Sequence, residues 1–215
     1  MKLMKSLLAA AALAASVSAS AGLTGQLGGG TGSFLALSGP SGAPCTSLTC
    51  TLGPGVATIV SGQTYLIDNQ FNDRPAGTNA ISGNFLSSGP TASAGLPAVL
   101  TFNAPVSYIS FLWGSPDLYN TLTVTTTTGN FNYTVGPTSL NFSVTNGNQS
   151  FSQYVEFIAT AGTMITGLTF ASPSQDAFES ANFSIVRVVP EPETYALMLA
   201  GLGALGFISR RRRRV

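Results

Sequence analysis

Apolar and polar side chains alternate along most of the chain between residues 57 and 188, and this two-residue period is typical of half-buried β-strands. The alternating segments are rich in Val, Thr, Tyr and Phe, and Gly, Pro and Asn separate them. No segment between residues 22 and 189 has the periodicity of a helix. The pattern predicts strands at residues 57–60, 64–67, 98–102, 106–113, 120–126, 130–135, 153–158, 165–170 and 182–188.

Short strands with turns between them predict an all-β fold, an antiparallel β-sandwich of the jelly-roll-like kind, over residues 57–189. The preceding residues 22–56 are rich in glycine, so we expect an irregular lead-in with one strand at residues 33–37. The glycine cluster at residues 28–32 lacks the Lys-Ser/Thr pair of a phosphate-binding loop. We therefore expect it to be flexible chain.

The first 21 residues differ from this pattern. Lys2 and Lys5 precede a short apolar run at residues 7–15, and small side chains follow up to Ala21. This order is typical of a secretory signal peptide, with Ala19 and Ala21 as the expected signal peptidase site. Residues 1–21 are accordingly predicted to direct export and to be removed.

The last segment, residues 190–215, has three parts. Pro190, Glu191 and Pro192 come first, an apolar stretch at residues 195–208 follows, and the basic residues are Arg210, Arg211, Arg212, Arg213 and Arg214. Fourteen apolar residues make about 21 Å of helix, which is short for a hydrocarbon core of about 30 Å. We expect a short transmembrane helix with transient inner-membrane association, whose arginines keep its C-terminus in the cytoplasm.

The order of motif, helix and arginine cluster resembles a PEP-CTERM sorting signal. This resemblance implies that an exosortase processes the tail, that the producer is Gram-negative, and that exopolysaccharide is a candidate partner. A plain single-pass anchor is the alternative interpretation. Gly-Leu-Gly-Ala-Leu-Gly at residues 201–206 matches a dinucleotide-binding pattern only formally, because the chain ends nine residues later without the acidic residue that such a site needs.

The body is also similar to a group of PEP-CTERM surface proteins. Their marks are Trp-Gly-Ser-x-Asp-x-Tyr-Asn, found here at residues 113–120, and a late Ala-Phe-Glu-x-x-Asn strand, found here at residues 177–182. Tyr154-Val-Glu-Phe157 lies between them, and the similarity covers roughly Tyr65 to Val188. The resemblance carries no activity over to this body, and Ala181 stands where the family often has an acidic residue, which weakens any inherited metal site.

Charged residues are only 8% of the chain, so the surface of the body is expected to be neutral and rich in hydroxyl groups. Between residues 22 and 189, two arginines stand against six carboxylates, a net charge of −4. A nucleic-acid partner is therefore not expected. The chain has no histidine, and residues 22–189 have no lysine, which excludes histidine-dependent triads, histidine metal centres and lysine catalysis.

Cys45 and Cys50 are the only cysteines, and in an exported protein they are expected to close a small disulfide loop rather than to bind a metal. Four carboxylates could form a glycosidase pair: Asp117, Glu156, Asp176 and Glu179. Turn and surface roles explain them equally well. A structural calcium ion on Asp117, Asn120 or Glu179 is a further alternative.

The sequence thus predicts an exported surface or extracellular-matrix protein that has no catalytic residues, cofactor or metal, and that signal peptidase and exosortase process. The first alternative is a carbohydrate-binding module with Trp113, Tyr119 and Tyr108 as its aromatic platform. The second is a secreted glycosidase that depends on Glu156 or Glu179.

Overall fold

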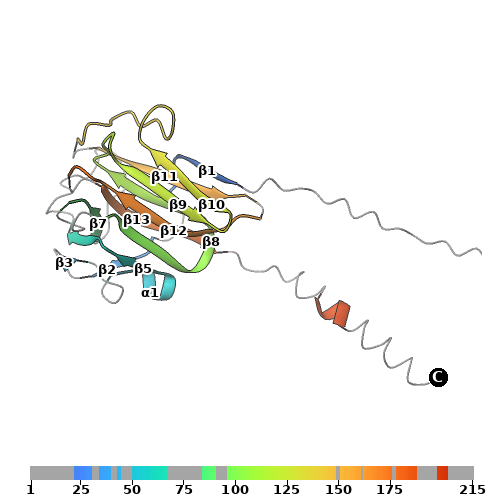
Figure 1. Ribbon diagram of the computed structural model, residues 1–215. Helices are drawn as coiled ribbons and strands as arrows, with labels where there is room; N and C mark the ends of the chain where they lie inside the picture. The colour runs from blue at the N-terminus through green and yellow to red at the C-terminus, as the bar shows by residue number, and fades with distance from the viewer. Residues whose placement is uncertain are drawn as a thin grey trace, which may run out of the picture.

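A computed structural model provides the fold of the chain (Figure 1). It describes residues 22–30, 34–39, 43–44, 50–66, 84–90, 96–148, 151–160, 162–175, 178–187 and 198–202. Within these ranges the protein is mostly antiparallel β-sheet, which confirms the all-β prediction. The strands are β1 (Leu23–Leu27), β2 (Leu37–Ser38), β3 (Ala43–Pro44), β4 (Thr51–Leu52), β5 (Ala57–Val60), β6 (Gln63–Leu66), β7 (Asn84–Ser88), β8 (Ala98–Gly114), β9 (Thr121–Thr126), β10 (Gly129–Thr134), β11 (Ser152–Ala159), β12 (Ile165–Ala171) and β13 (Phe178–Arg187).

Strand β8 joins the two predicted strands at residues 98–102 and 106–113 into one. Its first part pairs with β5 and β12, and its second part pairs with β11 and β13. Thr101 lies opposite Gly167 and Val106 lies opposite Ile165, so four residues of β8 stand against a single residue of β12 at this bulge. A bulge of this kind bends a strand and lets it leave one sheet for another.

The bend divides the hydrogen-bonded network into two halves, both of which contain part of β8 (Figure 1). Half A has the order β10, β9, β12, β8 (residues 98–102), β5, β4, β2. Half B has the order β1, β11, β8 (residues 106–114), β13, β7, β6, β3. Every pairing in both halves is antiparallel.

The hydrophobic core lies between the inner faces of the two halves. Phe111 of half B meets Phe170 of half A edge to face, with ring centroids 5.6 Å apart. Phe170 also contacts Phe178, and Trp113 stacks on Phe178 at 4.1 Å. All four side chains are fully buried. Aromatic contacts of this kind stabilise a core beyond the area that they bury.

The described part of the glycine-rich lead-in contains strands, whereas the sequence predicts irregular chain there. Leu23–Leu27 form β1, an edge strand that pairs with β11 of the body. The expected strand at residues 33–37 is wrong in place, since in the described residues 34–39 strand structure begins at Leu37. Gly25 explains why the alternating pattern is weak here, because it stands where an inward-facing apolar side chain would be expected. A Cβ at this position would lie 2.4 Å from the ring of Tyr133, which fills the space instead.

The expectation that the glycine cluster is flexible chain is also wrong for residues 28–30, which we call the glycine strap. The strap packs on the outer face of half B, where Gly28 N donates to Tyr154 O (2.8 Å) and Gly30 N donates to Ser110 Oγ (3.1 Å). A Cβ on Gly29 would lie 2.6 Å from the Ser110 Cβ. Glycine is therefore needed for close approach.

A four-residue segment, α1 (Gly53–Val56), connects β4 and β5. Pro54 and Gly55 have non-helical backbone angles, so this segment is a turn and agrees with the absence of helical periodicity. In the predicted C-terminal helix, the structure describes residues 198–202, which are helical and exposed. Within the described ranges, no helix has both the length and the apolar character that crossing a membrane requires.

Candidate functional site

The turn after β8 and the late strand β13 carry the two motifs that mark the body, and the fold brings them together. Ser115 Oγ donates a hydrogen bond of 2.5 Å to Glu179 Oε2. Both residues are almost completely buried, at 4% and 3% exposure. Burying a carboxylate is costly unless hydrogen bonds compensate for the lost water. We call Ser115, Asp117, Tyr119, Asn120 and Glu179 the carboxylate junction.

Local backbone geometry sets the position of Ser115. Its φ of 32° is positive, which is uncommon for a residue other than glycine, and its N–H donates to Phe151 O at 2.9 Å. The side chain leaves the end of β8 on the same side as Glu179, whose register partner is Gly114. The Gly-Ser-Pro sequence of the motif is therefore a strand end that turns a hydroxyl toward a buried acid.

Asp117 lies in the turn after β8, which is one of the roles that the sequence left open for it. Asn120 N donates to Asp117 O (2.9 Å), and Tyr119 OH donates to Asp117 Oδ2 (2.8 Å). Asp117 also forms an isolated antiparallel bridge with Asn146. A Cβ on Gly147 would lie 2.9 Å from both carboxylate oxygens of Asp117, so backbone closes over this side chain.

Tyr119 connects the two acids of the junction electrostatically. Burial raises the pKa of Tyr119 most, and the hydrogen bond to Asp117 and the negative charges of Asp117 and Glu179 raise it further. A raised pKa keeps the phenol protonated, so it remains a hydrogen-bond donor over the physiological pH range.

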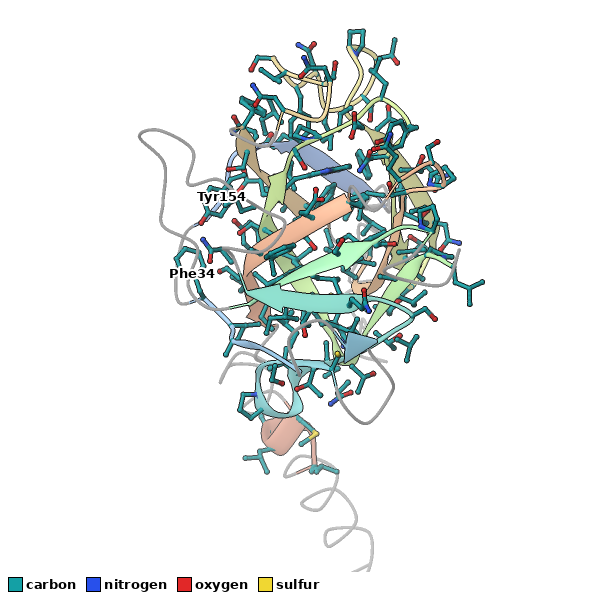
Figure 2. All side chains as sticks on the ribbon, turned by 90° about the vertical axis from the view of Figure 1, so that its left-hand side faces the viewer. Phe34 and Tyr154 are labelled. Atoms are coloured by element: carbon teal, nitrogen blue, oxygen red, sulfur yellow. The ribbon has the colours of Figure 1, made fainter. Side chains whose placement is uncertain are left out.

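The third marked segment, which contains Tyr154, meets β13 at a second point. Asn182 Nδ2 donates to Tyr154 OH at 3.0 Å. Asn182 has a φ of 51° and lies where the pairing of β13 with β8 shifts register. Phe34 stacks on Tyr154 with ring centroids 6.3 Å apart, and Figure 2 shows the two rings next to each other. Sequence reasoning named these segments but not their contacts.

Glu156 lies away from the junction. Its Oε1 accepts from Gln26 Nε2 (2.6 Å) and its Oε2 accepts from Tyr108 OH (3.0 Å), which links β1, β8 and β11. Glu156 is opposite Ser110 of β8, whereas Glu179 is opposite Gly114, four residues further along. Four residues of strand span about 13 Å. Glycosidase carboxyl groups lie roughly 5 to 10 Å apart, so the strand register gives no support to a catalytic pair of Glu156 and Glu179.

The aromatic platform that the sequence offers for carbohydrate is wrong for Trp113. This side chain is fully buried and packs against Phe178 and Phe142 in the core. Tyr108 and Tyr119 are partly exposed, but each hydroxyl is bonded to a carboxylate. The three rings therefore form no common surface, because they belong to three different environments.

The remaining predicted residues fall partly outside the described ranges. Outside them lie Asp176, Cys45, the signal peptidase site at Ala19 and Ala21, the Pro190-Glu191-Pro192 motif and the arginines at residues 210–214. Cys50 is described and fully buried, and its pairing with Cys45 stays a prediction. In the described part of the chain, no group of three or more His, Cys, Asp or Glu side chains could hold a metal ion.

Comparison with known proteins identifies the tail. Residues 188–214 match the PEP-CTERM protein-sorting motif, the family that the order of Pro-Glu-Pro, apolar stretch and arginines resembles. No curated protein matches the chain, and no solved structure does.

Proposed function

We propose that this chain, which carries a PEP-CTERM sorting motif at residues 188–214, is an exported surface or extracellular-matrix protein without catalytic activity. The motif implies exosortase-dependent sorting to the cell surface by way of the membrane. This one observation carries the proposal, because it determines where the β-rich body works. Signal peptidase would remove residues 1–21 first, and the tail would hold an inner-membrane intermediate until the exosortase acts.

The use of the carboxylates supports a structural role for the body. Glu179 accepts from Ser115, Asp117 accepts from Tyr119, and Glu156 accepts from Gln26 and Tyr108. All of these donors are neutral and all belong to the fold. A structural role, in which each carboxylate holds strands or turns together, is enough to explain these residues without a catalytic one.

The arrangement of the strands supports a β-sandwich as the architecture of this body. The two halves share β8 and bury one core between their inner faces, which is how sandwiches are built. We extend this to the jelly-roll-like class, which likewise packs two antiparallel sheets face to face. The body would then be a rigid unit for display at the cell surface, and exopolysaccharide would be its partner there.

The intact mass of the mature protein tests the sorting proposal. An epitope tag placed directly after Ala21 remains on the product when the tail is removed. We expect the purified protein from cells with the exosortase to lack the segment beyond about Pro190, and the protein from cells without the enzyme to keep it.

A tail variant provides the matched control. With Pro190, Glu191 and Pro192 all changed to Ala, the apolar stretch and the arginines remain, so membrane insertion is unaffected while the motif is lost. This variant should keep its tail even in cells that have the exosortase. Equal tail masses for wild-type protein in both kinds of cell would refute the proposal and leave an ordinary single-pass anchor.

A further inference from the structure

The outer face of half A carries a row of small polar side chains that a single glycine interrupts. Register pairing connects neighbouring strands through β10, β9, β12, β8, β5, β4 and β2. Gly167 is the member of the row on β12. The side chains of the row, in spatial order, belong to Asn130, Thr125, Thr101, Thr58, Thr51 and Ser38.

These side chains face solvent. Thr101, Asn130 and Ser38 are exposed, and Thr125, Thr58 and Thr51 are half-buried, while their sequence neighbours Leu100, Val124 and Leu52 are buried in the core. Neighbouring strands lie about 4.8 Å apart, and alternate residues along a strand lie about 7 Å apart. Thr121 and Thr123 continue the pattern along β9, so the face is a two-dimensional array of hydroxyl groups and methyl groups.

The array carries no charge. None of the strand segments of half A contains Asp, Glu, Lys or Arg, although half B contains Glu156 and Glu179. An uncharged face gives no electrostatic attraction to nucleic acid, acidic lipid or charged peptide. It also lacks the large aromatic or aliphatic anchors that a protein interface uses at its centre.

We call this outer face of half A, with its row from Asn130 to Ser38, the threonine face. We propose that the threonine face binds an uncharged polysaccharide. Each Thr or Ser hydroxyl is both donor and acceptor, as is each sugar hydroxyl, and the Asn side chain has both kinds of group. The Thr methyl groups, together with Val99 and Val60 on the same face, provide apolar contact for the C–H faces of sugar rings. The match is therefore to a neutral chain of sugars rather than to an acidic one.

The twist of the sheet selects the form of the partner. Adjacent strands rotate by roughly 20° relative to one another, so a row that crosses seven strands follows a curved track. A flexible single polysaccharide chain can follow such a track, but the flat face of a crystalline fibre cannot. This inference rests on the proposed surface location and specifies the partner of the body there.

Affinity electrophoresis of the exported full-length chain tests the inference. Gels contain a soluble neutral polysaccharide (hydroxyethylcellulose or glucomannan), an acidic one (alginate), or none. We expect retardation by a neutral polysaccharide and none by alginate. Thr101→Glu places a charge at the centre of the row and should weaken binding about ten-fold or more, while Thr24→Glu, on exposed β1 of half B, should bind as wild type does.

A second variant separates loss of hydroxyl groups from added charge. Thr101→Val, Thr123→Val and Thr125→Val together keep the shape and strand propensity of the face and should also weaken binding, with the melting temperature unchanged within a few degrees. Three outcomes would overturn the inference: no retardation of wild type, stronger retardation by alginate, or equal loss in Thr101→Glu and Thr24→Glu. Tail removal by the exosortase is measured independently, so failure here leaves the sorting result intact.

Discussion

Glu179 is the residue whose environment departs most from what a surface carboxylate would have. Its side chain is only 3% exposed and lies beside Ser115. Its register partners on the two neighbouring strands are Ser87 of β7 and Gly114 of β8. Small side chains on both neighbouring strands leave room for the carboxylate on the outer face. The acid is thus part of the fold, and the need to satisfy its oxygens explains the buried hydroxyl of Ser115 beside it.

Tyr119 provides a prediction at the same scale. Its folded-state pKa is raised above the ordinary value of 10.0 by burial, by the bond to Asp117 and by nearby negative charge. Above about pH 10 the unfolded chain loses this proton while the folded chain keeps it, so the free energy of unfolding falls as pH rises; below that pH it does not depend on Tyr119 ionisation. Tyr119→Phe should make this alkaline decline shallower, as urea unfolding between about pH 8 and pH 11 would measure.

The pH 8 measurement is the internal reference for Tyr119→Phe. There the variant should lose about 1 kcal/mol, because the hydrogen bond to Asp117 is gone. Burial also raises the pKa of Tyr133, so part of the alkaline decline should persist in the variant. Identical slopes above pH 10 for wild type and variant would contradict the assignment of the decline to Tyr119.

Strand β8 decides the architecture at the scale of elements. It is long enough to serve both halves, and the bulge opposite β12 lets it turn between them. Gly167 lies at this bulge, and a Cβ there would be 2.7 Å from the Leu100 carbonyl oxygen. Backbone cannot move aside as a flexible side chain can.

Gly167→Ala should therefore destabilise the protein by about 1–3 kcal/mol through overpacking at the bend. Gly136→Ala is the matched control, since its Cβ would meet only Thr134 Oγ1 at 3.8 Å and its backbone angle does not require glycine. Chemical unfolding of both variants measures the difference. If the two lose equal stability, close approach at the bulge is not what Gly167 provides.

At the scale of the whole molecule, the described carboxylates of the body already have hydrogen-bond donors from the protein. We therefore predict that neither Ca²⁺ nor a chelator changes the melting temperature of the full chain, since an ion that binds only the folded state would raise it. Calorimetry with and without Ca²⁺ makes the measurement. A rise in melting temperature that Asp117→Asn or Glu179→Gln abolished would establish the calcium site that the sequence offered as an alternative.

Local sequence was sufficient for much of the molecule. Alternation predicted the strands around Val124, Phe157 and Phe170. Each of these strands buries one face only, so its apolar residues recur at every second position. The order of Pro190-Glu191-Pro192, apolar stretch and arginines identified the sorting motif, because such a signal is read as a linear segment. The absence of histidine and lysine from the body excluded whole classes of chemistry by composition alone.

The tertiary structure decided the features that depend on contacts between residues far apart in the sequence. The glycine strap and Gly25 look like flexible chain in sequence, and only their closeness to Ser110 and Tyr133 shows why a side chain is missing there. The pairing of Ser115 with Glu179 joins residues 64 positions apart. The threonine face needs the registers of seven strands at once, because no single strand contains more than a short part of the row. Sequence determined which residues face outward, and the fold determined which of them are neighbours.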